Sequence, residues 1–147
     1  MSAVAQAVPT VSGRSVPGIE NEVLGQLKAA FGSKLVIARV ARPRLVEIAF
    51  DRSDLIAVCT YLKNTLGFEH LSCITTVDWK DHFESIYHIE NYYNGCMVQA
   101  TARIPYEDPK IASVTEFWNA ANYHEREGWD LMGITFQGHP HLERILL

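Results

Sequence analysis

The stretch FESIYHIENYYNGCMVQATARI, residues 83–104, decides the fold class. Its first half alternates with a period of two, which is typical of a strand with one buried face. Phe83, Ser85, Tyr87 and Ile89 share one side, and Ile86, His88 and Glu90 share the other. The Asn-Gly pair at 94–95 then gives the strongest short signal for a hairpin turn, and a second β-type run follows it. The stretch therefore predicts two antiparallel strands joined by a tight turn.

The preceding segments supply three more strands. HLSCITTVDW (70–79) is a β-type run, and so are LVIARV (35–40) and LVEIAF (45–50), which we expect to form a hairpin around Pro43. One helix is predicted before these runs and a second between residues 50 and 70. Residues 19–31 have apolar side chains at helical spacing, and a second helix is expected to start at Ser53 as its N-cap.

A third helix is predicted from near Ser113 to near Gly133. The expected element order is α-β-β-α-β-β-β-α, which predicts an α+β fold. Its architecture is a two-layer sandwich, in which helices cover a mixed sheet of about five strands. Residues 1–17 have the composition of a flexible tail, although a targeting segment stays open as an alternative, and 18–147 are expected to form a single domain.

Composition limits the function. The net charge of −4 gives no reason to expect nucleic acid, which would require clustered lysine and arginine. No apolar run approaches the roughly 18 residues that span a bilayer, so we expect any membrane association to occur through partners. The three cysteines form no CxxC pair, so the sequence supports neither a zinc site nor an iron–sulfur cluster. Scattered cysteines on apolar stretches are typical of buried free thiols.

The predicted third helix contains one unusual position. On a wheel of about 100° per residue, Glu125 falls in the middle of the apolar stripe. A charged carboxylate there is costly unless it is paired or protonated, so Glu125 is expected to be a buried structural acid with a partner beyond its own helix. Arg126 and Asp130 are four residues apart on the flank, as in a surface ion pair, and Glu127 is expected to point the opposite way.

Residues 121–147, ANYHEREGWDLMGITFQGHPHLERILL, resemble the signature of the 30-kDa subunit of the NADH:quinone oxidoreductases (respiratory complex I). The matching positions are Glu125, Arg126, Glu127, Asp130, Leu131, Met132, His139, Ile145 and Leu146. The family also includes the corresponding subunits of membrane-bound hydrogenases and deazaflavin-dependent dehydrogenases. Two positions depart from its pattern. Glu143 stands where a basic residue is usual, which leaves Arg144 as the nearby base, and Met132 replaces an aromatic residue.

The resemblance implies a non-catalytic scaffold in the peripheral arm of a membrane-bound, energy-converting oxidoreductase. It implies docking on a partner that resembles the hydrogenase large subunit, which we call the large-subunit partner. A second partner, which carries a [4Fe–4S] cluster and is called the cluster-bearing partner, would lie close by. Iron–sulfur clusters, and flavin or NiFe depending on the branch of the family, would then lie in partner subunits, with no cofactor, metal or catalytic residue in this chain. The implied location is peripheral, on the cytoplasmic side of the membrane. Glu125, Arg126, Glu127, Asp130, His139 and Arg144 would be signature or interface residues.

The C-terminal run from Phe136 to Leu147 is expected to dock on a partner, because its apolar end follows a turn once the sandwich is complete. A different class of function also stays open. The chain could be a stand-alone α+β metal-binding protein or hydrolase, since imidazole and carboxylate groups are suitable metal ligands. The side chains available for it are His124, Asp130, His139 and His141.

Overall fold

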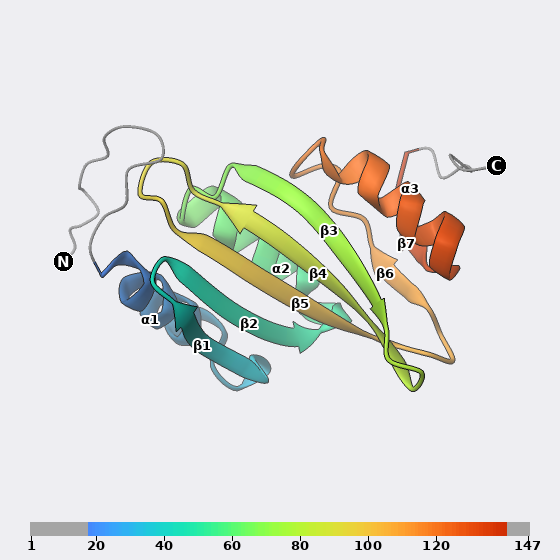
Figure 1. Cartoon of the computed structure of the whole chain (residues 1–147), viewed down its shortest axis with the longest axis horizontal. Coiled ribbons are helices and arrows are strands. Elements are labelled where there is room, and N and C mark those ends of the chain that lie inside the picture. The colour runs from blue at the N-terminus through green and yellow to red at the C-terminus, as the bar shows by residue number, and fades with distance from the viewer. Residues whose placement is uncertain (1–17, 141–147) are drawn as a thin grey trace.

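A five-stranded mixed sheet forms one layer of the domain (Figure 1). The computed structural model describes residues 18–140. The strands are β1 (Ile37–Arg42), β2 (Leu45–Asp51), β3 (His70–Asp78), β4 (His82–Glu90) and β5 (Met97–Pro105), and their spatial order is β1-β2-β5-β4-β3. The pairs β1–β2, β3–β4 and β4–β5 are antiparallel, whereas β2 and β5 run parallel. The predicted α+β class and five-stranded mixed sheet are confirmed.

The hairpin that the opening stretch predicts is formed by β4 and β5. Gly95 has a φ of 77°, a left-handed conformation that glycine adopts without steric cost. Asn91 secures the turn, because its Oδ1 accepts from the backbone N–H of Tyr93 at 2.9 Å and its Nδ2 donates to the carbonyl of Leu66 at 3.0 Å. The alternation along β4 is also confirmed, since Phe83, Ser85, Tyr87 and Ile89 are all buried.

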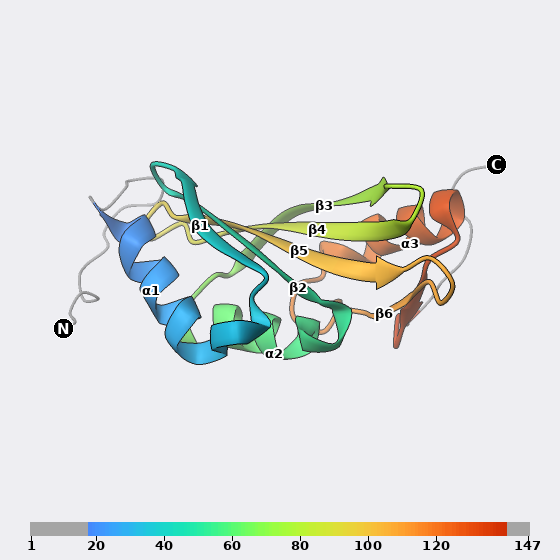
Figure 2. The ribbon, with the colours of Figure 1, turned by 90° about the horizontal axis from the view of Figure 1, so that it is seen from below.

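Helices cover one face of this sheet. Figure 2 shows α1 (Ile19–Phe31) and α2 (Leu55–Thr60) together below the strands. A 3₁₀ turn, Gly32–Lys34, follows α1, and α2 runs on into a π-helical turn, Tyr61–Thr65. The buried side chains of these helical segments are Ile19, Val23, Leu27, Leu55, Val58, Cys59 and Leu62.

The cap of the second helical segment differs from the prediction. The segment opens with a 3₁₀ turn, Arg52–Asp54, and the capping side chain is that of Asp51. Its carboxylate accepts from both the backbone N–H and the hydroxyl of Ser53, at 3.0 and 2.7 Å. Ser53 is therefore the donor in this cap, and the predicted role of Ser53 as the N-cap is wrong.

The third helix is shorter than predicted. α3 spans Ala121–Met132, and residues 113–120 form turns instead of helix. Side-chain and backbone bonds from other elements hold this segment in place. The Nζ of Lys63 donates to the carbonyl of Phe117 at 2.8 Å, and the indole N–H of Trp118 donates to the carbonyl of Phe68 at 3.2 Å. These tertiary contacts override the helical periodicity of the segment.

The structure contains two short strands that the sequence patterns do not predict. β6 (Lys110–Ala112) and β7 (Thr135–Gln137) pair in parallel as a separate two-stranded sheet. Phe136 in β7 is only 2% exposed. The docking segment is predicted to begin at Phe136, and this boundary is wrong, because Phe136 belongs to the core of its own domain. Residues 141–147 lie outside the described residues.

Gly128 determines how closely α3 approaches its neighbours. A Cβ at this position would lie 3.1 Å from Cε1 of Phe136 and 3.3 Å from Oγ1 of Thr76. These contacts are shorter than ordinary van der Waals distances, so the helix can approach both β7 and β3 only because the side chain is absent. The buried side of α3 consists of Ala121, Glu125 and Gly128.

Candidate functional site

Glu125 is the most strongly constrained residue of α3. Its side chain has 0% exposure, and both of its oxygens accept hydrogen bonds from the segment that precedes the helix. The hydroxyl of Ser113 donates to Oε1 at 2.7 Å, and the backbone N–H of Val114 donates to Oε2 at 2.8 Å. The carboxylate therefore links α3 to the chain immediately after β6.

Ser113 extends this link to β7. Its backbone N–H donates to the carbonyl of Gln137 at 2.7 Å, and its Oγ lies 2.9 Å from Oγ1 of Thr115. A single polar network thus joins β6, β7, the pre-helical turns and α3. Because buried polar groups are costly when they are unpaired, this network favours one arrangement of the four elements.

The protonation of Glu125 reflects two opposing influences. Burial raises the pKa of its carboxyl group to about 7, while the bonds from Val114 and Ser113 oppose that rise. Cys59 lies in the same part of the core, and burial, assisted by the charge of Glu125, raises the pKa of its thiol. Carboxyl groups with raised pKa values are common in active sites, but structural groups show them too. Glu125 has no exposed surface and both of its oxygens accept hydrogen bonds, which is the environment of a structural group.

The other signature residues are dispersed around α3. Arg126 and Asp130 are half-buried on the flank of α3. Nε2 of His139 lies 3.1 Å from the backbone carbonyl of Asn122, at the first turn of α3. Arg144 and His141 lie outside the described residues. Within residues 18–140, no group of three or more His, Cys, Asp or Glu side chains is placed to hold a metal ion.

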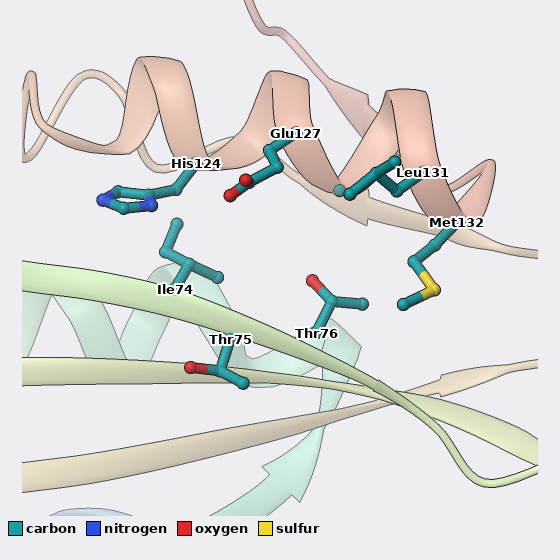
Figure 3. Close-up of a pocket in the computed structure, with 8 residues that line it drawn as sticks. Ile74, Thr75, Thr76, His124, Glu127, Leu131 and Met132 are labelled. Atoms are coloured by element: carbon teal, nitrogen blue, oxygen red, sulfur yellow. The ribbon is translucent and has the colours of Figure 1, made fainter. Parts of the chain in front are cut away.

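Glu127 does not point away from the domain, and the predicted direction is wrong. Figure 3 shows Glu127 and His124 on the side of α3 that faces β3, at a pocket of about 260 Å³. The apolar stripe of the wheel centres on Glu125, but the helix is rotated so that Gly128 also contacts its neighbours. The helical wheel orients α3 by its apolar side chains alone, and glycine has no side chain to count. The prediction for Glu127 is wrong because the wheel could not include the packing of Gly128.

A second cluster of acids and a histidine lies at the β3–β4 turn. The hydroxyl of Tyr106 donates to both oxygens of Asp78, at 2.9 and 3.0 Å, and the backbone N–H of Lys80 donates to Oδ1 of the same carboxylate at 2.8 Å. Lys80 has a φ of 77°, so Asp78 stabilises a left-handed turn residue. The ring of His82 lies 2.7 Å from Asp81 and 3.3 Å from Glu84. This cluster is accounted for by turn geometry and cross-strand pairing.

Sequence reasoning missed the partners of Glu125. The apolar periodicity places Ser113 and Val114 at the start of the same helix, and side chains in one helix cannot satisfy a group eleven or twelve positions away. A signal was available in Ser113-Val114-Thr115, because a β-branched pair beside serine is typical of turns and strand ends.

The fold and this buried link define a class: a small α+β domain in which the first acid of a charged helical motif is buried and bonded to the preceding segment. Residues 48–147 match the family described as the 30 Kd subunit of respiratory-chain NADH dehydrogenase. The chain belongs to this family.

Curated relatives agree with this assignment. The chain is 34% identical over 128 residues to a subunit of the F(420)H(2) dehydrogenase of Methanosarcina mazei, an alignment that covers 85% of this chain and 80% of the relative. It is also 34% identical over 140 residues to a subunit of the NADH-quinone oxidoreductase of Roseiflexus castenholzii, with 95% and 75% covered. These relatives are, by name, subunits of oxidoreductases.

Two solved structures share the fold. A trypsin-resistant fragment of Nqo5 superimposes with a TM-score of 0.72 and 25% identity, covering 84% of this chain and 99% of the fragment. A chain of the membrane-bound sulfane sulfur reductase, described as an archaeal respiratory membrane complex, gives 0.77 and 24% identity, with 86% and 75% covered. Within residues 18–140, no helix is long and apolar enough to cross a membrane.

Proposed function

We propose that this chain is a non-catalytic scaffold subunit in the peripheral arm of a membrane-bound, energy-converting oxidoreductase. The proposal includes docking on the large-subunit partner, near the cluster-bearing partner with its [4Fe–4S] cluster, on the cytoplasmic side of the membrane. Electron-carrying centres would lie in those partners, which deliver electrons to a quinone or to protons. Attachment to the membrane would occur only through other subunits.

One observation carries this proposal above all: Glu125, the first acid of the family motif, is sealed in the core by Ser113 and Val114. A motif whose leading acid is inaccessible supports a role in assembling a structure. The names of the relatives point the same way, since they are subunits of multi-subunit oxidoreductases.

The alternative of a stand-alone metal-binding protein or hydrolase gains no support from the geometry. His124 lines the pocket beside β3, whereas His139 lies against the carbonyl of Asn122. Asp130 is on another side of α3 from His124. These three groups do not converge on one point among the described residues.

The proposal is tested by purification from membranes. The chain with an N-terminal affinity tag should be extracted in mild detergent and bring down the large-subunit and cluster-bearing partners in stoichiometric amounts, identified by mass spectrometry. Recovery of the chain alone, or with unrelated proteins, would contradict the proposal. Iron analysis and a visible spectrum of the separately expressed chain test its second part, because retained iron or a stoichiometric chromophore would show a cofactor of its own.

A further inference from the structure

The pocket between α3 and β3 combines apolar walls with a single carboxylate. Its volume is about 260 Å³, and its apolar walls come from Ile74 of β3 and from Leu131 and Met132 of α3. His124 and Glu127 supply the polar groups along the helix, as Figure 3 shows. Leu131 is 60% exposed, so a large apolar side chain borders the opening.

Glu127 has no counter-charge within the described part of the chain. Among residues 18–140, no lysine or arginine forms an ion pair with it, and no group donates a hydrogen bond to it. Its side chain is nevertheless half-buried in the wall of the pocket. A partly desolvated carboxylate is favourable only when a donor or a cation compensates for the lost water.

The shape and the charge of this pocket fit a long basic side chain. The methylene stem of a lysine or arginine can lie along Ile74 and Leu131 while its charged end reaches a carboxylate. A metal ion would fit less well, because one carboxylate and one imidazole are too few protein ligands for a stable site. The net charge of −4 also favours a basic partner.

We propose that this pocket receives a lysine or arginine side chain of a neighbouring protein in the complex, whose ammonium or guanidinium group pairs with Glu127. The inference rests on the proposed function, since it requires that the chain be held in a complex. It adds a definite contact: one basic residue of the partner inserted between α3 and β3, with Leu131 at the edge of the interface. Binding then covers the exposed leucine and neutralises the carboxylate together.

Charge reversal at Glu127 tests the contact in the assembled complex. Tagged wild type, Glu127→Gln, Glu127→Lys and the control Glu116→Lys are purified from membranes, and the amount of each partner per tagged chain is quantified by mass spectrometry. Glu116 is an exposed acid before α3, so its reversal makes the same change in charge outside the pocket. Glu127→Lys should lower partner recovery roughly tenfold or more, and Glu127→Gln severalfold, while Glu116→Lys matches wild type.

Recovery of partners with Glu127→Lys at the level of Glu116→Lys would overturn the inference and leave the proposed function standing. A wild-type chain that captures no other oxidoreductase component would overturn both. If Glu127→Lys melts below wild type, photo-cross-linking decides the question. A photoreactive residue at Leu131 should capture a partner peptide next to a lysine or arginine, whereas one at exposed Val36 should not. A cross-link from position 131 to residues 141–147 of the same chain would overturn the inference.

Discussion

Glu125 makes the stability of the domain depend on pH in an unusual direction. Burial raises the pKa of its carboxyl group from 4.5 to about 7, so the folded state binds a proton that the unfolded state has already released between these values. The stabilisation by this proton is complete below pH 4.5 and is lost as the pH rises through about 7. A shift of this size corresponds to about 3 kcal/mol of folding free energy.

The substitution Glu125→Gln isolates this effect. Glutamine keeps the size of the side chain, its carbonyl oxygen can accept from Val114, and it cannot ionise. We expect the variant to be less stable than wild type, or equal to it, at pH 5. Between pH 5 and pH 8 its free energy of unfolding should rise by about 2–3 kcal/mol relative to that of wild type. Glu125→Ala, in contrast, leaves the donors of Ser113 and Val114 unpaired and should cost about 2–4 kcal/mol at pH 5.

Urea denaturation followed by circular dichroism at pH 5, 6, 7 and 8 measures these differences. Exposed acids and histidines also titrate, but they are the same in both proteins, so their contributions cancel when wild type and variant are compared. Glu116→Gln provides the matched control, because it removes an exposed acid from the same region. If wild type and Glu125→Gln keep a constant difference from pH 5 to 8, the buried carboxyl group is not protonated near neutrality and the reasoning is refuted.

Three further changes give definite expectations. Gly128→Ala places a Cβ against side chains of β3 and β7 and should destabilise the domain by about 1–3 kcal/mol in thermal melts. The matched control Gly25→Ala, in α1 with open space around it, should stabilise the domain by roughly 0.5–1 kcal/mol. Arg52→Ala removes bonds of 2.7 and 2.9 Å to the carbonyl and the carboxylate of Asp108 and should increase amide exchange in β6, whereas unchanged exchange would show that the link is dispensable. Deleting residues 140–147 should leave the circular dichroism spectrum unchanged yet abolish recovery of the large-subunit partner from membranes, and full recovery would show that this segment is not part of the contact.

Local sequence patterns predict the sheet well. The alternation in β4 and the Asn-Gly signal before β5 are local, and the predicted hairpin forms. The connection between its strands is longer than the predicted tight turn, because it spans residues 91–96. The burial of Glu125 was also predictable, because its place on the apolar stripe depends only on helical spacing inside α3.

The remaining features depend on contacts between distant segments. β6 and β7 have three residues each, too few for a periodic signal, and they form because each pairs with the other. The start of α3 is delayed because two long-range bonds hold the preceding turns: Lys63 donates to the carbonyl of Phe117, and Trp118 donates to the carbonyl of Phe68. The pocket at Glu127 lies between α3 and β3 beside Gly128, and helical spacing alone does not predict it.

The parallel pairing of β2 with β5 has a consequence for the order of folding. β3, β4 and β5 form a meander of local hairpins, whereas the partners Leu45 and Met97 are about fifty residues apart along the chain. Closing so long a loop costs entropy before any contact compensates for it, so local hairpins should form earlier in the transition state. We therefore expect Val46→Ala in β2 to accelerate unfolding more than it slows refolding, and Ala100→Gly in β5 to slow refolding. Stopped-flow kinetics in urea would distinguish this sequence of events from simultaneous assembly of all five strands.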